Sequence, residues 1–288
     1  MRPGTALTLA LVSAALPGCF TADAERTASL CGMKRLFSGL TGDDVVALSV
    51  AVVERPIGDR ALNQDLWELV DEGVLDSDRR ALLGRNGFRV GGVGGSPPPA
   101  LYALICSDQS CCDNPRRIQL RSGNAHSVPL GPVQATCVFH VDQDGRKSAV
   151  DLAQARCHLR VVPKLAQGGA VTLHFTPFIK HGDLKQKPVA VRTAGGELQW
   201  SLQFGQDEEC YPGLAWEMTV GANDTVVIGT RPDAANTLGL RTFMQSETAA
   251  PVQRLLVLRV GRVLGDPRAK VDAEGDDVPL AIQAGLAE

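Results

Sequence analysis

The stretch that decides the fold runs from Val189 to Phe204 and reads VAVRTAGGELQWSLQF. Its second half alternates large apolar with polar residues: Leu198, Trp200, Leu202 and Phe204 against Gln199, Ser201 and Gln203. A period of two residues predicts a strand with one apolar and one polar face. Two such runs joined by Ala194-Gly195-Gly196 predict an antiparallel hairpin. We expect its apolar face, and Trp200 with it, to lie in the core of a β domain.

The same alternation continues on both sides of the hairpin. Four further segments alternate in this way, at 137–141, 157–161, 171–175 and 216–220, and short apolar runs follow at 226–228, 240–244 and 255–260. Turn residues separate these segments. About eight short strands of this kind indicate a mainly antiparallel, β-sandwich-like domain over residues 133–262.

Residues 44–106 show a different pattern. Residues 45–53 are almost continuously apolar and β-branched, which is typical of a strand covered on both faces. Asp59 can cap a helix with Leu62, Leu66, Leu69 and Val70 on one side, and Asp76 or Ser77 can cap a second helix that ends at Asn86-Gly87. Another strand begins at Phe88, and a helical turn follows at 101–105.

These patterns together predict an α+β fold. A small α/β N-terminal subdomain would occupy 44–106, a linker 107–132, and the β-sandwich-like domain 133–262. Residues 263–288 hold six acidic against two basic residues, and we expect this tail to be disordered.

The first eighteen residues have the parts of an export signal. Arg2 is the positive residue, and residues 6–15 are uncharged and mostly apolar but too short to span a bilayer. Leu16-Pro17-Gly18-Cys19 then resembles the lipobox of bacterial lipoproteins. This resemblance implies that a signal peptide, 1–18, is removed and that the thiol of Cys19 carries a diacylglyceryl group. Residues 19–43 would be the tether.

The net charge and the predicted export indicate which classes of partner this protein binds. The chain has 29 Lys and Arg against 32 Asp and Glu, a net charge of −3, which gives no general attraction for nucleic acid. We expect the protein to face the periplasm or the exterior from the cell envelope. Its partners would be the membrane, through the lipid anchor, and other envelope proteins.

Seven further cysteines follow the lipobox cysteine. They are Cys31, Cys106, Cys111, Cys112, Cys137, Cys157 and Cys210. In an exported protein the default fate of cysteine is a disulfide, and an odd number leaves at least one thiol over. Cys137 and Cys157 lie in strand-like segments and could bridge neighbouring strands. The spacings contain no C-x-x-C pair, which argues against a metal site.

Catalytic motifs are missing from the sequence. Neither G-x-S-x-G nor H-E-x-x-H occurs, and no cofactor is indicated. The strongest polar cluster is His174, His181 and Asp183, which are close in sequence and could converge at a strand end. It leaves open a periplasmic hydrolase or metalloenzyme as an alternative function.

Two sets of segments in the sequence resemble known proteins. Residues 54–59, 66–72 and 86–91 resemble a block in uncharacterised bacterial envelope proteins, which implies no activity. Residues 171–177, 218–220 and 224–229 are similar to the β-core of secretins, the outer-membrane rings of secretion systems. Thr230 departs from that pattern, which has a second glycine there.

The function predicted from these observations is a membrane-anchored envelope lipoprotein that acts as a non-catalytic binding or assembly module. The second resemblance implies the alternative of a secretin-related component of a secretion or assembly system. Whether the protein is an enzyme stays open at this point, although the absence of a motif favours a binding module.

Overall fold

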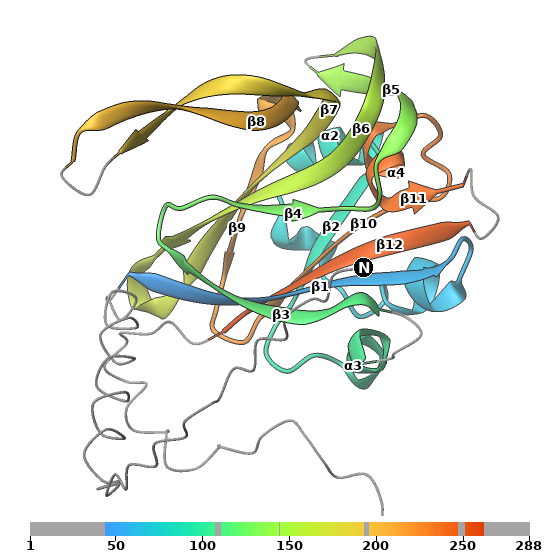
Figure 1. Ribbon diagram of the computed structural model, residues 1–288. Helices are drawn as coiled ribbons and strands as arrows, with labels where there is room; N and C mark the ends of the chain where they lie inside the picture. Colours follow the sequence, from blue (N-terminus) through green and yellow to red (C-terminus); the bar gives the residue numbers. More distant parts are fainter. Residues whose placement is uncertain (1–43, 107–110, 144, 193–195, 247–250, 262–288) are drawn as a thin grey trace, which may run out of the picture. The chain divides into compact units, whose positions relative to one another are not determined.

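Two antiparallel β-sheets make up most of the described chain (Figure 1). The structure is a computed structural model, and it describes residues 44–106, 111–143, 145–192, 196–246 and 251–261. All of these described residues belong to one compact unit, Gly42–Glu288. The predicted signal peptide, tether, Cys19 and Cys31, and the acidic tail from residue 263 onward lie outside the described residues.

The first sheet has the strand order β2-β10-β12-β1-β3, with β11 beside β12. Its strands come from both ends of the described chain: β1 (Val45–Pro56), β2 (Phe88–Val93), β3 (Cys111–Arg121), β10 (Thr225–Thr230), β11 (Met244–Gln245) and β12 (Val252–Val260). In the centre, β1 pairs with β12 from Leu48↔Val260 to Pro56↔Val252.

The continuous apolar run in β1 is explained by cover on both faces of this sheet. Val46, Leu48, Val50 and Val52 belong to the core between the two sheets. On the opposite face, Val53 packs in a second apolar cluster with residues of the helical segments, including Leu62, Leu66 and Leu101. The prediction of a strand buried on both faces is therefore confirmed, although all its neighbours are antiparallel.

The second sheet has the order β4-β6-β7-β8, with β5 also paired to β6 and β9 to β7. Its strands are β4 (His126–Pro129), β5 (Gln134–Gln143), β6 (Arg146–Leu165), β7 (Val171–Arg192), β8 (Leu198–Cys210) and β9 (Trp216–Val220). The strands β6 and β7 are unusually long, at 20 and 22 residues, and each changes neighbours along its length. The first half of β6 pairs with β5, and the second half pairs with β4 and β7.

Aromatic rings fill the space between the two sheets. Phe175 of β7 stacks on Trp216 of β9 at a centroid distance of 5.1 Å, and Trp216 also meets Phe88 of β2 at 6.1 Å. Phe243 completes the row edge-on to Phe88 at 6.3 Å. Because these contacts join strands of both sheets, the sheets share one core.

The helical segments are short: α2 (Ser77–Arg85), α3 (Pro99–Cys106), α4 (Leu238–Phe243) and the single turns η1 (Ala61–Asp65), η2 (Glu72–Val74), η3 (Gln167–Gly169) and η4 (Pro212–Leu214). The turns η3 and η4 connect strands of the second sheet, β6 to β7 and β8 to β9. The carboxylate of Asp76 accepts from the N–H of Arg79 at 2.8 Å, which confirms Asp76 as a helix cap. Asp59 caps η1 through the N–H of Ala61 at 2.8 Å.

The connection between α2 and α4 depends on two glycines. A Cβ on Gly239 would lie 2.3 Å from the carbonyl carbon of Gly87, so the two backbones could not approach with any larger residue there. The N–H of Gly239 donates to the carbonyl of Asn86 at 2.8 Å. Asn86 is fully buried, and its side-chain amide bonds to the backbone of Asp142 in both directions, at 2.8 Å each. This contact ties α2 and α4 to β5.

The predicted fold class is wrong. Residues 44–106 do not form an α/β subdomain, because β1 and β2 are hydrogen-bonded into the same sheet as β10 and β12. The molecule is mostly β, with two antiparallel sheets and few helical residues. The predicted linker 107–132 contains β3 and β4. The error has a physical cause: an apolar run shows that a strand is covered on both faces, but not which strands lie beside it.

Candidate functional site: a projecting β-hairpin

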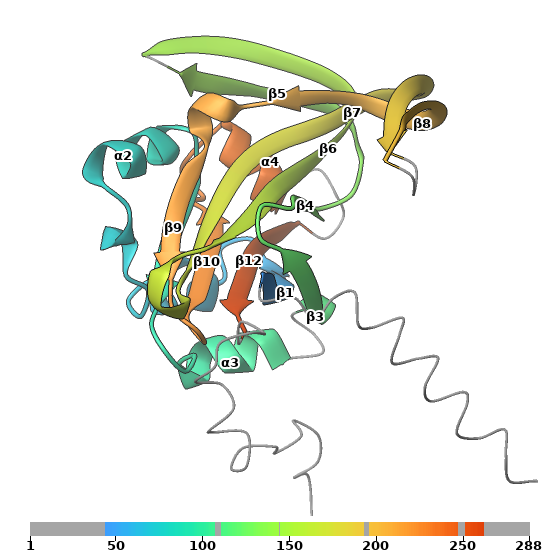
Figure 2. The ribbon, with the colours of Figure 1, turned by 90° about the vertical axis from the view of Figure 1, so that its left-hand side faces the viewer.

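The most unusual feature of the surface is a two-stranded hairpin that extends beyond the second sheet. The strand β7 pairs with β9 as far as Phe175 and with β6 as far as Lys180. From Lys185 to Arg192 it pairs with β8 alone, in the register Lys185↔Gly205 to Arg192↔Leu198. We call residues 185–192 and 198–205 the arm. Figures 1 and 2 show this ribbon reaching away from the two sheets.

One face of the arm is apolar. Residues opposite each other in an antiparallel pair share a face, so Pro188 and Ala190 lie beside Leu202 and Trp200. The four large residues of this face are almost fully in solvent, with exposed fractions of 69% for Leu198, 74% for Trp200, 68% for Leu202 and 70% for Phe204. The neighbouring positions on β8 are Gln199, Ser201 and Gln203, so the opposite face is polar on this strand.

The prediction that Trp200 lies in the core is therefore wrong, although the two strands lie where the sequence predicts them. The predicted turn, Ala194-Gly195-Gly196, falls mostly outside the described residues. Alternation shows which residues share a face, and it holds whether that face meets the core or a separate partner. Pro188 is a local sign in the sequence that this part of the hairpin lies at an edge. Pro188 cannot donate to a ladder, so prolines inside strands are confined to edges and bulges.

The base of the arm is held by polar contacts that the sequence motifs did not reveal. The register shifts between His181 and Lys185, and Gly182 has a φ of +72° there. The side-chain amide of Gln206 donates to the carbonyl of Gly182 at 2.8 Å. Lys187 and Lys185 both contact the Asp207 carboxylate, at 2.8 and 2.9 Å, and they lower the pKa of Asp207 to about 2. These contacts set the direction in which the arm leaves the sheet.

The edges of the arm are also open. Among the described strands, β8 pairs with β7 and with no other strand. Unpaired N–H and C=O groups along a strand edge form a template for another strand, and natural proteins usually blunt such edges with charge. Residues 198–206 contain no ionisable side chain.

The three residues of the predicted polar cluster are not brought together. His174 lies seven residues before His181 on the same strand, a separation of roughly 23 Å in an extended chain. His174 faces Glu217 of β9, with 3.9 Å between Nε2 and Oε1, whereas His181 is paired in register with Asp207. Asp183 lies in the register shift and is exposed. In the described part of the chain no three His, Cys, Asp or Glu residues are grouped so that they could hold a metal ion.

The described cysteines fall into two groups. Cys106 and Cys210 are exposed, whereas Cys137 and Cys157 are buried, and none of these four is disulfide-bonded in the structure. Cys111 and Cys112 begin β3. The predicted disulfides therefore remain a prediction.

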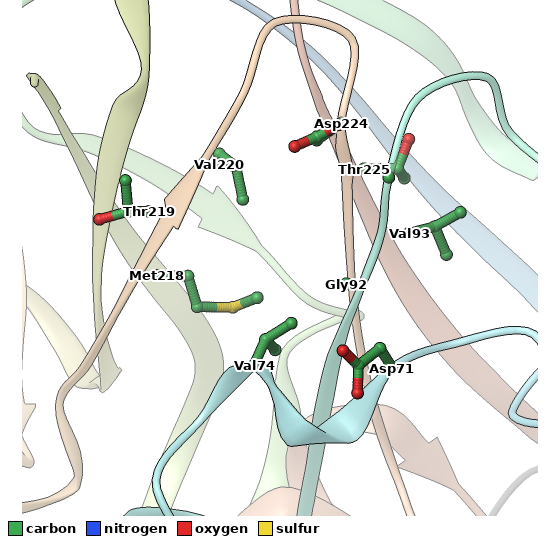
Figure 3. Close-up of a pocket in the computed structure, with 10 residues that line it drawn as sticks. Asp71, Val74, Gly92, Val93, Met218, Thr219, Val220, Asp224 and Thr225 are labelled. Atoms are coloured by element: carbon green, nitrogen blue, oxygen red, sulfur yellow. The ribbon is translucent and has the colours of Figure 1, made fainter. Parts of the chain in front are cut away.

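A pocket of about 260 Å³ lies where η2 and β2 meet the turn between β9 and β10 (Figure 3). Two carboxylates line it, and both are already used by the backbone. Asp71 accepts from the N–H of Gly73 at 2.7 Å, and Asp224 accepts from Gly221 at 2.7 Å and Gly95 at 2.8 Å. The rest of the lining is mainly apolar, with Met218 in the middle of the view. Both acids therefore hold turns of the backbone at this pocket.

Comparisons with known proteins do not assign a family. No protein-family model matches the chain, and no curated protein matches it. One solved structure with some similarity is the secretin-domain β-barrel of InvG, from the needle-complex base of the Salmonella SPI-1 injectisome. It is 10% identical over 81% of this chain, the match spans 65% of the length of that structure, and the TM-score is 0.18. A score this low does not establish a shared fold. No helix among the described residues is long and apolar enough to cross a membrane.

Proposed function

We propose that this protein is a non-catalytic assembly module of the cell envelope, and that its arm docks against the arm of a second copy of the same chain. The observation that carries the proposal is the exposed apolar face formed by Leu198, Trp200, Leu202 and Phe204. A two-stranded ribbon without cover has little stability in water, so this element needs a partner surface.

The area of the face supports a contact between two equal partners. Large side chains present roughly 150–250 Å² each, so the four residues at about 70% exposure offer roughly 500–600 Å² of apolar surface. Soluble monomers rarely leave a contiguous patch of that size in water unless it is functional. Two such faces together approach the ~1,200 Å² at which specific interfaces begin.

The shape of the face favours a second copy. The large residues of β8 form a ridge, and Pro188 and Ala190 of β7 form a lower shelf beside it. A two-fold axis that relates two antiparallel arms would place each ridge over the partner's shelf. Residues 198–206 carry no charge, and the register places Gln186 and Arg192 of β7 at the two ends of this face, opposite Phe204 and Leu198.

Anchoring forms the second half of the proposal. The Leu16-Pro17-Gly18-Cys19 segment supports lipidation of Cys19, which would hold the described body at a membrane face. Chains confined to one surface meet at a high effective concentration, which favours association through a face of modest area.

Sedimentation velocity tests the arm contact on the full chain carrying Cys19→Ser, so that no lipid is attached. We expect this chain to sediment as a dimer at micromolar concentration. The double variant Trp200→Ser and Phe204→Ser removes the centre and one end of the ridge, and we expect it to sediment as a monomer. Circular dichroism checks that both proteins are folded.

The matched control places two substitutions on the other face of the same strand, Gln199→Ala and Gln203→Ala, and should leave the dimer intact. If the parent chain is a monomer at every concentration, the arm binds a different partner and the proposed contact is wrong. A ridge variant that still dimerises would show that the interface lies elsewhere.

A further inference from the structure

Two arginines from different sheets line one pocket, which includes no residue of the arm. Arg254 lies on β12 of the first sheet, and Arg156 lies on β6 of the second. The pocket has a volume of about 260 Å³, and Glu54 of β1 is the acidic residue in its lining. The segment between β4 and β5 forms one of its walls. The proposed contact between arms gives this pocket no role.

Both guanidinium groups lie against the same residue of that wall, Gly131. The Nε of Arg156 donates to the carbonyl of Gly131 at 2.7 Å. A Cβ at position 131 would lie 2.9 Å from Nη1 of Arg254, and the φ of Gly131 is +91°, so both the space and the backbone favour glycine. The preceding Leu130 is 1% exposed, and its N–H donates to the carbonyl of Cys157 at 2.9 Å. The wall is therefore held in place by the core.

Arg254 is buried but has a donor to spare. Only 5% of its surface is exposed. Its Nε donates to Oε1 of Glu54 at 2.6 Å, and its Nη2 donates to Oε1 of Gln245 at 2.9 Å. Within the described part of the chain, Nη1 has no hydrogen-bond partner, and it is not one of the fully buried polar atoms. Because an unpaired donor on a buried charge is costly, Nη1 is the atom that Arg254 can offer to a ligand.

The charges that line the pocket do not balance. Arg254 and Glu54 form an ion pair, whereas Arg156 is paired with no carboxylate among the residues that the structure describes. The neighbour of Arg156 in register on β7 is Lys180, which is a second cation. The lining therefore has two positive charges and one negative charge, and one further carboxylate would neutralise it. The planar guanidinium group is the side chain best suited to bind a carboxylate.

We propose that this pocket binds a small organic acid with a single carboxylate. The carboxylate would accept from Nη1 of Arg254 and from the terminal nitrogens of Arg156. The hydrocarbon part would lie against the apolar part of the lining, which consists of Val52, Pro129 and Pro132. Small-molecule sites combine an apolar lining with a few placed polar groups in this way, and they usually measure ~300–1,000 Å³. A pocket of about 260 Å³ therefore limits the ligand to a small acid.

Isothermal titration calorimetry tests the site on the full chain carrying Cys19→Ser. The probes are sodium butyrate and sodium benzoate, titrated at constant ionic strength. We expect one saturable site per chain for at least one of these acids. Butyramide has nearly the shape of butyrate without its charge, and it should not bind. The absence of saturable binding of both acids, or equal binding of butyramide and butyrate, would overturn the proposal.

Two charge-matched variants locate the site. Arg156→Gln removes the unpaired charge but keeps a donor for the carbonyl of Gly131, and it should weaken binding roughly tenfold or more. The control Arg160→Gln removes the same charge four residues further along β6, next to Glu208, and should leave the affinity unchanged. Circular dichroism checks that both variants are folded. An equal loss of affinity in both variants would assign binding to the general charge of the surface and refute the site.

Discussion

At the scale of single residues, the fold changes the pKa of His158. It lies on β6 with only 9% of its surface exposed, stacked on Phe178 at a centroid distance of 5.0 Å. Its Nδ1 is 3.0 Å from the hydroxyl of Ser127. Burial, together with the positive charges of Lys180 and Arg156, lowers the pKa of His158 to about 4.

This pKa predicts a pH-dependent stability. Below about pH 6.5 the unfolded chain protonates His158, while the folded chain stays neutral there until about pH 4. The free energy of unfolding should therefore fall as the pH drops from 6.5 to 4, by roughly 3 kcal/mol at most. Urea unfolding at several pH values should show a weaker dependence in His158→Gln. The exposed His140→Gln is the control, and an equal dependence in all three proteins would contradict the assignment.

At the scale of elements, the arm and the core differ in what a tryptophan contributes. Trp216 is 2% exposed and stacks on Phe175, whereas Trp200 is 74% exposed. Trp216 loses its contact with water on folding, whereas Trp200 keeps most of its contact with water. Substitution of these two tryptophans, on two strands of the same sheet, is therefore expected to change stability by very different amounts.

We predict that Trp200→Ala shifts the melting temperature of the dilute, monomeric protein by less than about 2 °C, because little surface is buried there. Trp216→Ala should cost ~3–5 kcal/mol through lost transfer energy and the cavity left behind, and lower the melting temperature by about 10 °C or more. Differential scanning calorimetry on Cys19→Ser protein measures both. A large loss in Trp200→Ala would mean that the arm folds back onto the body.

At the scale of the whole molecule, location depends on a residue outside the described ranges. If the thiol of Cys19 carries a diacylglyceryl group, the body is held at a membrane although no described helix crosses one. We predict that Cys19→Ala abolishes metabolic labelling by fatty acid and moves the protein from the membrane to the soluble fraction. Cys31→Ala should change neither. Continued labelling of Cys19→Ala would rule out this anchor.

Much of the local structure could be predicted from the sequence. Asp76 caps α2, Asn86-Gly87 ends it, and the period-two pattern around Trp200 marks a strand and the residues that share its face. These features depend on contacts between residues a few positions apart, where hydrogen bonding and side-chain direction follow directly from residue type. For the same reason the sequence determined which arm residues share a face.

Tertiary structure decided the rest. The pairing of β1 with β12 joins residues about 200 positions apart, and no local pattern distinguishes that partner from others. Whether the ridge around Trp200 meets the core depends on where β6 and β9 stop pairing with β7. A pattern of apolar residues records that a face needs cover, and only the packing of the whole chain determines what covers it.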